Sequence, residues 1–406
     1  MWILYLFFSL MLLCPTLFQF QRGIILLFLI LAGIMKFRQA YHINKRLNRV
    51  ALIALATSVC FIFWGICNGA PGAIKIMSVY LMWPILYFVF IATCSNYRTI
   101  YMLIKTFIYV GILVCLMNLL LLINATLLNI GTLSKLAESL NIGFGLYDGY
   151  IEFSSPSLSV APLLFYFSFT FFILNDRHIL VSNKTIVLAI LSSLITILFS
   201  GRRAFWLMVL VAPFVIYIFC KLAKYRARKL KYLLPVSFFL AFILLIAIFV
   251  FFDYQILYET FVSSFDFEED LSNSIRAEQY TALVDRWIES PLIGHGLGAY
   301  APQCIRSEIS VWSYELSYLA LLMNVGIIGF ILYSFCTGWI FIKSFKVIRK
   351  DKNYAIIVLP FISSLFLILC LHASNPYLTK FDYMWPLFIP VLILNTIYCK
   401  QKSQQL

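Results

Sequence analysis

Two adjacent arginines stand between two apolar runs, in Ser200-Gly201-Arg202-Arg203-Ala204. Guanidinium forks hold phosphate oxygens bidentately, and a helix that starts at Ala204 would add backbone N–H groups aimed at an anion. Arg202 and Arg203 are therefore candidate ligands of a phosphate group. The structural alternative is that they snorkel to lipid headgroups or pair with acidic loop residues.

A glycine-rich run lies further along the chain. Arg276 and Arg286 precede Pro291-Leu292, and Gly294-His295-Gly296-Leu297-Gly298 follows. The glycine spacing superficially matches a dinucleotide-binding loop, but no strand–helix unit surrounds it, so we discount that match. Such closely spaced glycines instead allow a backbone to approach a neighbour or a ligand. A plain loop that re-enters the membrane before the next helix explains the run equally well.

Glu315 opens another apolar run, in Tyr314-Glu315-Leu316-Ser317-Tyr318-Leu319. A carboxylate at a helix N-terminus is stabilised by the helix dipole, so a capping role is sufficient to explain it. A carboxylate near the membrane surface that faces an arginine cluster is also a candidate general base. Gly326 and Gly329, further along, are typical of helix packing.

The elements that position these residues must lie in lipid. Of the 406 residues, 63% are hydrophobic and only 12% are charged, and the mean hydropathy is +0.94. A soluble enzyme, a secreted disulfide scaffold and a disordered chain are all excluded. Because a bilayer core takes roughly 20 apolar residues of helix, we expect an all-α integral membrane protein with about twelve transmembrane helices. They are approximately Ile3–Phe20, Gly23–Met35, Val50–Cys67, Ile76–Thr93, Thr106–Ile123, Leu158–Leu174, Ile186–Phe199, Ala204–Leu222, Tyr232–Phe252, Tyr314–Ile342, Tyr354–Leu371 and Tyr383–Tyr398.

The basic residues orient these spans. Most of the 31 Lys and Arg residues fall in alternate loops, in groups such as Lys36–Arg49, Lys221–Lys231 and Lys343–Lys352. The positive-inside rule then predicts that both termini lie in the cytoplasm. The net charge of +14 is thus a topology signal, and we expect contact with membrane lipid and no nucleic acid as a partner.

Two segments on the predicted outer side are long. Residues 124–156 form an outer loop in which Leu127–Leu140 is expected to lie along the interface as an amphipathic helix. Residues 253–313 form the large outer loop between the ninth and tenth spans. No internal repeat or second domain is apparent, so residues 1–406 are expected to form one polytopic membrane domain.

Neither the cysteines nor the histidines indicate a cofactor. Nine of the ten cysteines lie in or at the ends of apolar runs, and only Cys304 lies in the large loop. The four histidines are scattered and lack a metal-ligand spacing. We expect no disulfide framework, no bound metal and no cofactor.

Taken together, the chain resembles the superfamily of O-antigen polymerases and O-antigen ligases of bacterial envelopes. The resemblance covers the whole architecture of many spans and one large outer loop, and three stretches carry it most sharply. Ser200–Ala204 resembles the family's Ser-Arg-(Gly/Ala) helix start, with Arg203 at the matching place. Arg276 with Pro291–Gly298 is similar to the family's Arg…Pro-Leu-x-Gly-x-Gly-x-Gly stretch, and Glu315–Gly326 is similar to the helix after the outer loop.

The resemblance implies a glycosyltransferase in the bacterial inner membrane with its active site facing the periplasm. It would move a growing glycan from undecaprenyl pyrophosphate onto an incoming lipid-linked repeat unit, without a nucleotide sugar. Family ligases typically carry His-Asn where this chain has Glu315-Leu316, which favours O-antigen polymerase. The resemblance also suggests a separate chain-length regulator protein as a partner.

The family's reaction gives the candidate residues their roles. Arg202 and Arg203 would hold the pyrophosphate, with Arg276 or Arg286 closing on it. Glu315, or His295 as second candidate, would deprotonate the acceptor hydroxyl in a single displacement. Catalysis is thus expected at Glu315, His295 and Arg203. Three alternatives stay open: a ligase that transfers glycan to the lipid A–core, a lipid-linked oligosaccharide flippase or transporter, and a cell-wall glycan polymerase.

Overall fold

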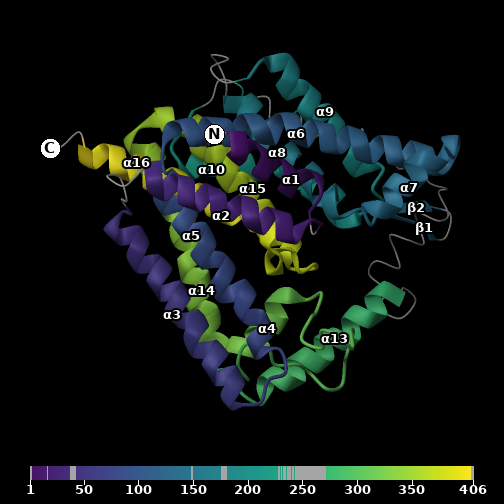
Figure 1. Cartoon of the computed structure of the whole chain (residues 1–406), viewed down its shortest axis with the longest axis vertical. Helices are drawn as coiled ribbons and strands as arrows, with labels where there is room; N and C mark the ends of the chain where they lie inside the picture. Colours follow the sequence, from purple (N-terminus) through teal and green to yellow (C-terminus); the bar gives the residue numbers. More distant parts are fainter. Residues whose placement is uncertain are drawn as a thin grey trace. The chain divides into compact units, whose positions relative to one another are not determined.

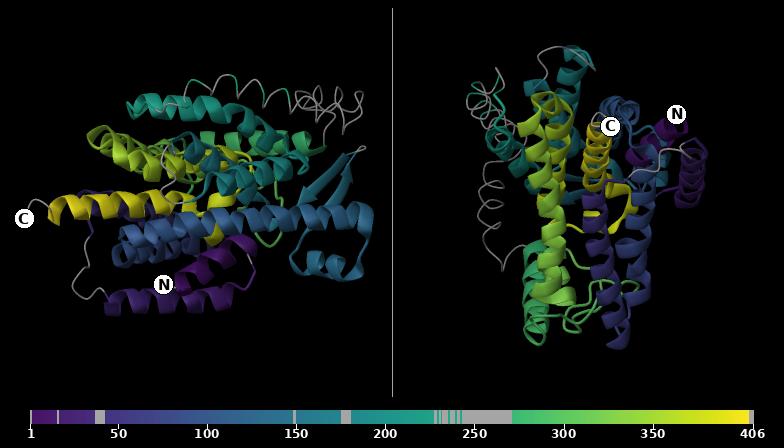
Figure 2. Two further views of the ribbon diagram at one scale, coloured as in Figure 1. Left: turned by 90° about the horizontal axis from the view of Figure 1, so that it is seen from above. Right: turned by 90° about the vertical axis from the view of Figure 1, so that its left-hand side faces the viewer.

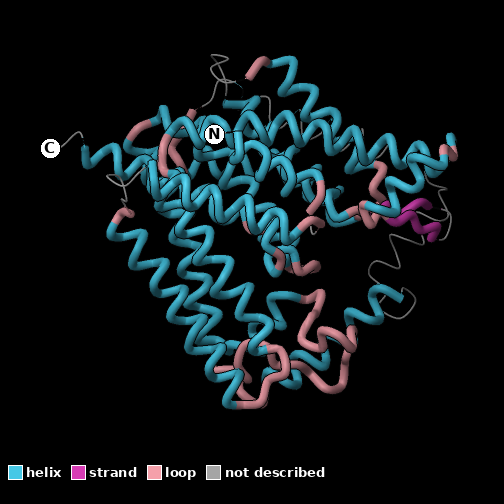
Figure 3. Tube along the Cα trace, viewed as in Figure 1, coloured by secondary structure: helices cyan, strands magenta, loops and turns pink. Residues whose placement is uncertain are grey.

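The computed structural model describes residues 2–15, 17–36, 43–147, 150–174, 181–226 and 271–403, together with residues 229, 231, 235, 239 and 242. This part of the chain is mostly helical, with loops and one short hairpin (Figure 3). It divides into two compact units. Unit 1 comprises Met1–Lys36, Cys94–Tyr258 and Ser344–Leu367; unit 2 comprises Phe37–Thr93, Glu259–Lys343 and Ile368–Leu406.

Within the described residues, 7 helical segments are long and apolar enough to cross a membrane: Lys45–Cys67, Ala73–Cys94, Tyr97–Leu128, Pro156–Leu174, Arg203–Leu222, Ser317–Lys350 and Lys352–His372. Shorter apolar helices cover Trp2–Leu13, Gln19–Ala32, Asn183–Leu198 and Trp385–Lys400. Every predicted span that falls in the described residues overlaps one of these helices. The predicted ninth span, Tyr232–Phe252, lies outside them except for residues 235, 239 and 242, so the total of twelve and the orientation stay predictions.

Unit 1 is built around a predominantly apolar and buried helix, α8 (Val160–Leu174). Its elements are α1 (Trp2–Leu13), α2 (Gln19–Lys36), α6 (Tyr97–Ile123), α7 (Gly131–Ser139), α8 (Val160–Leu174), α9 (Asn183–Leu198), α10 (Arg203–Leu222) and the first part of α15 (Ala355–His372). Nearly every residue of α8 is buried. Figures 1 and 2 show α6 beside α1, α8 and α9. Ring contacts such as Phe167–Phe361, with centroids 4.9 Å apart, fill the core.

The first predicted span is too long. The sequence predicts a helix over Ile3–Phe20, whereas α1 ends at Leu13 and α2 starts at Gln19. Pro15 has no N–H to donate and its ring clashes with the preceding turn, which disfavours a helix that continues through it. Phe18 adopts a left-handed φ of 52° in the connection. As a result Arg22, which was expected between two spans, lies inside α2 and is buried.

The segment 124–156 contains a hairpin that the all-α expectation missed. The predicted interfacial helix corresponds to α7, preceded by a π-helical turn over Asn124–Leu128. After it, β1 (Gly143–Tyr147) pairs antiparallel with β2 (Tyr150–Ser154), with Gly143 opposite Ser154. The sequence between the strands is Asp148-Gly149, a dipeptide typical of hairpin turns. This dipeptide is the feature from which the hairpin could have been predicted.

Unit 2 consists mainly of long helices side by side, among them α3, α5 and α14 (Figures 1 and 2). Ser58 of α3 and Tyr333 of α14 join them through a 2.8 Å hydrogen bond between their hydroxyls. The predicted tenth span appears as the 34-residue α14, with non-helical backbone at Gly326. The elements of unit 2 are α3 (Lys45–Cys67), α4 (Ala73–Met77), the π-helical Ser78–Met82, α5 (Trp83–Cys94), α13 (Leu271–Ile288), α14 (Ser317–Lys350) as far as Lys343, the end of α15, and α16 (Trp385–Ser403).

Candidate functional site

The glycine-rich run and the residues just before it bond to the backbone on both sides of a break in α14. At Gly326 the backbone takes φ 59° and ψ −172°, which interrupts the helical hydrogen bonds. The N–H groups of His295 and Gly296 donate to the carbonyl oxygens of Met323 and Asn324 at 3.1 and 2.7 Å. On the other side of the break, the N–H groups of Ile327 and Ile328 donate to the carbonyl oxygens of Pro291 and Leu292 at 2.9 and 3.1 Å. The run thereby satisfies backbone groups that a broken helix would leave unpaired at membrane depth.

Glycine is required in this run because other backbones lie against it. Gly296 has φ +92°, and a Cβ atom there would come within 2.2 Å of Gly65 Cα in α3. The neighbouring Leu297 N–H donates to the carbonyl oxygen of Phe61 at 2.9 Å. The close approach that the sequence predicts is therefore made to α3 and α14 of the same unit.

A carboxylate and two guanidinium groups meet just before α14. Arg276 Nε of α13 donates to Glu315 Oε2 at 2.9 Å, and Arg306 Nη1 pairs with Glu315 Oε1. The Glu315 side chain is 18% exposed, whereas those of Arg276 and Arg306 are 36% and 44% exposed. We call these three residues the Glu315 cluster. It carries one net positive charge and presents its guanidinium groups to the surface.

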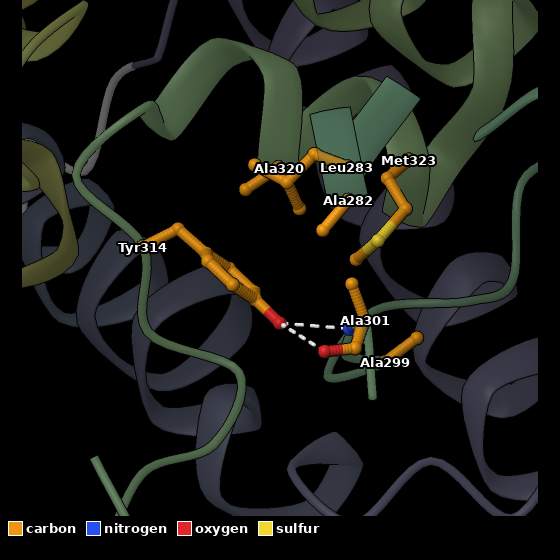
Figure 4. Close-up of a cluster of buried hydrophobic side chains, with 7 residues drawn as sticks. All are labelled: Ala282, Leu283, Ala299, Ala301, Tyr314, Ala320 and Met323. Carbon is orange, nitrogen blue, oxygen red and sulfur yellow. Dashed lines mark hydrogen bonds between the residues drawn. The ribbon is translucent and has the colours of Figure 1, made fainter. Parts of the chain in front are cut away.

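Buried contacts hold Glu315 in place. Gln279 of α13 is fully buried, and its Oε1 accepts the Glu315 backbone N–H at 3.0 Å. Beside it, Tyr314 packs into a core formed with Ala282, Leu283, Ala299, Ala301, Ala320 and Met323 (Figure 4). The Tyr314 hydroxyl accepts the Ala301 N–H at 2.7 Å, and burial raises the pKa of Tyr314 above its ordinary value. Buried contacts between α13, the 299–301 loop and α14 therefore fix the position of Glu315.

Arg286 and His295 form a separate group. Arg286 is paired with Glu289, and the His295 ring nitrogen Nε2 lies 2.6 Å from the carbonyl oxygen of Arg286. Because a carbonyl oxygen only accepts, Nε2 is the nitrogen that carries the proton. In this tautomer Nδ1 is the nitrogen that can accept a proton from a substrate.

Arg202 and Arg203 belong to unit 1, where they stand between α9 and α10. The turn depends on Gly201, whose φ is +69°, and on the buried Ser200, whose carbonyl oxygen accepts the Phe153 N–H at 3.3 Å. Arg202 Nη2 donates to Ser154 Oγ of β2 at 3.4 Å, and Arg203 is the first residue of α10. Both arginines are partly exposed. The hairpin thus borders the arginine pair.

The structure brings together Arg276 with Glu315, and Arg286 with His295. Sequence reasoning missed Arg306 and Gln279 as members of the Glu315 cluster. Arg306 had a signal, since it is a cation within the predicted outer loop, but its pairing depends on tertiary structure. Among the residues that the structure describes, no group of three or more His, Cys, Asp or Glu side chains lies close enough to hold a metal ion.

The spans and the charged groups at their ends define a polytopic helical membrane protein. Residues 187–334 match the family model Wzy_C, described as O-Antigen ligase, so this segment is a domain of the O-antigen ligase/polymerase family. The resemblance predicted from the sequence is confirmed, and the matched segment contains every candidate site residue. No curated protein matches the chain.

Proposed function

We propose that this protein is an O-antigen polymerase, which joins undecaprenyl-pyrophosphate-linked repeat units at the periplasmic face of the bacterial inner membrane. The Glu315 cluster carries the proposal: two partly exposed guanidinium groups share one carboxylate at the start of a membrane span. The cluster lies within the segment that matches the ligase/polymerase family.

The reaction requires stabilisation of a diphosphate leaving group. A hydroxyl of the acceptor sugar attacks the anomeric carbon of the donor glycan, and the bond from that carbon to the pyrophosphate oxygen breaks. The released pyrophosphate gains negative charge beside a medium of low dielectric constant, where fixed cations stabilise it strongly. Arg276 and Arg306 supply such cations in unit 2. The arginine pair of unit 1, Arg202 and Arg203, is a separate candidate for phosphate binding.

Glu315 links anion binding to proton transfer in this scheme. Both of its carboxylate oxygens are engaged by guanidinium groups. A bound pyrophosphate competes for the same groups and releases the carboxylate, which then accepts the proton of the attacking hydroxyl. His295 is the second candidate base, through Nδ1.

Polymerase is preferred to ligase because this chain has Glu315-Leu316 where ligases of the family typically carry His-Asn. Ligase activity, in which glycan passes to the lipid A–core, is the second candidate, since the matching family model is described as O-Antigen ligase. Electrophoresis of surface glycan from a deletion strain separates the two. Loss of the ladder with survival of one-repeat material supports a polymerase, whereas loss of both supports a ligase.

The role of Glu315 is tested in the same strain by complementation. Glu315→Gln keeps the size of the side chain but removes its basicity, so polymer should disappear, while Glu315→Asp should retain some. Both variants must reach the membrane at the abundance of the unmodified protein. Equal polymer from Glu315→Gln and the unmodified protein would refute a base role.

A further inference from the structure

One face of α14 is an exposed apolar stripe. Ile328, Ile331, Phe335 and Ile342 are all exposed large hydrophobic residues, and their spacing places them on one side of the helix. Because α14 is long and apolar enough to span a bilayer, such a stripe is the surface on which lipid chains pack.

The stripe continues beyond α14 onto the segment 288–293. Backbone hydrogen bonds from Ile327 and Ile328 to Pro291 and Leu292 hold this segment against the first turn after the Gly326 break. There Leu292 is 59% exposed and Ile288, the last residue of α13, is 62% exposed; Ile293 is exposed as well. Exposed apolar residues of the predicted outer loop therefore lie next to the part of the span that follows Gly326.

The flanks of the segment have the composition of a membrane interface. Trp287 directs its indole N–H to the carbonyl oxygen of Pro291 at 3.2 Å, so its ring lies against the segment. Arg286 and the exposed Glu289 form an ion pair at the same helix end. Tryptophan and paired charges next to an aliphatic patch are typical of the headgroup level.

We propose that the apolar side chains of the segment 288–293, namely Ile288, Leu292 and Ile293, are inserted into the bilayer beside the part of α14 around Gly326, and that lipid acyl chains are their partner. The Arg286–Glu289 ion pair stays at the headgroup level. This inference does not depend on the proposed reaction. It divides the expected outer loop 253–313 into a part that enters lipid and a part that carries Arg306 and leads to Glu315. The Glu315 cluster then stands on a lipid-anchored base formed by α13 and α14.

Photocrosslinking to lipid tests the proposal in the intact chain with its native cysteines. A benzophenone amino acid is placed at Leu292 or Ile288, at Ile331 as the lipid-facing control, and at Gln303 as an exposed control outside the stripe. After irradiation of native membranes, adducts of phospholipid with the protein are measured by mass spectrometry. We expect the yield at 288 and 292 to match that at 331 and to exceed that at 303 several-fold.

Two results would overturn the proposal. Yields at 288 and 292 as low as at 303 would place the segment in water. Crosslinks from 288 and 292 to the protein itself, without lipid adducts, would show that another part of the chain covers it. All four side chains are exposed, so the probe replaces no core residue, and membrane abundance confirms that each variant folds.

Discussion

Arg276 and Glu315 are 39 residues apart in the sequence and are joined by a 2.9 Å ion pair. Arg276 belongs to α13, and Glu315 lies just before the start of α14 at Ser317. Since the two side chains are partly exposed, this pair contributes less than about 1 kcal/mol to stability. We therefore expect the pair to matter because it positions the Arg276 guanidinium group. A variant in which the two charges are exchanged keeps an ion pair between these positions but moves the guanidinium group, so it tests the two effects separately.

The exchange variant combines Arg276→Glu with Glu315→Arg. Each single substitution should reduce polymer by about 10²-fold, because a fixed cation or the base is lost. The double variant should regain membrane abundance without regaining polymer, as measured by surface-glycan electrophoresis and immunoblotting. Recovery of polymer in the double variant would show that the ion pair alone matters.

Arg203→Ala tests the arginine pair of unit 1. We expect surface glycan reduced to one repeat unit, with transfer slowed about 10²-fold or more by the loss of a cation that stabilises the leaving group. Lys135→Ala, which removes an exposed cation of α7, is the matched control and should leave the ladder unchanged. A full ladder from Arg203→Ala at normal abundance would contradict the role of this arginine.

Gly296→Ala should destabilise unit 2 by about 3 kcal/mol or more, because left-handed backbone strain adds to a clash with α3. Gly69→Ala is the control: its φ is +68°, but nothing lies within 4 Å of the added Cβ. That variant should lose only about 1 kcal/mol. Denaturant unfolding in detergent measures both. Equal losses would mean that the contact with Gly65 is not tight.

Tyr314→Phe removes the acceptor of the buried Ala301 N–H and should cost about 1–3 kcal/mol. Burial raises the pKa of Tyr314, so the folded state favours the protonated hydroxyl. The stability that this group contributes is complete below its ordinary pKa of about 10 and is lost as the pH rises above it. Unfolding measured across that range should show an alkaline loss that is weaker in Tyr314→Phe. Identical pH profiles would contradict the assignment.

Reporter fusions test the orientation of α14. Alkaline phosphatase fused after Gln303 should be active, and green fluorescent protein fused after Lys352 should fluoresce, because basic residues at the end of α14 retain that end in the cytoplasm. The reverse pattern would invert the predicted topology. Activity of both reporters at one site would mean that the helix does not fix the orientation.

Hydropathy alone predicted most of the described spans, since apolar content over a bilayer's thickness decides whether a helix enters lipid. It could not place the breaks, which depend on single residues. Pro15 ends α1 early, and Gly326 interrupts α14 where its composition gives no warning. The hairpin at 143–154 had a local signal, but its strands are short and lie within an apolar sequence.

The site was predictable by residue type and not by pairing. Arg276, Glu315 and the glycines stood out from the sequence because charge and glycine are conspicuous in an apolar chain. Arg306 became significant only when folding brought it to Glu315. Likewise, the glycine run predicted a close approach, yet only the structure shows that its partner is the interrupted backbone of α14.

The Gly326 break has a mechanical consequence. Four backbone hydrogen bonds join residues 291–296 to α14, two to residues before Gly326 and two to residues after it. Neither half of α14 can slide along its axis or rotate without moving residues 291–296 or breaking these hydrogen bonds. In the proposed reaction, a glycan that enters or leaves near Glu315 would then be accommodated by the 299–313 loop or by the joined halves of α14 moving together, and not by one half moving against the other.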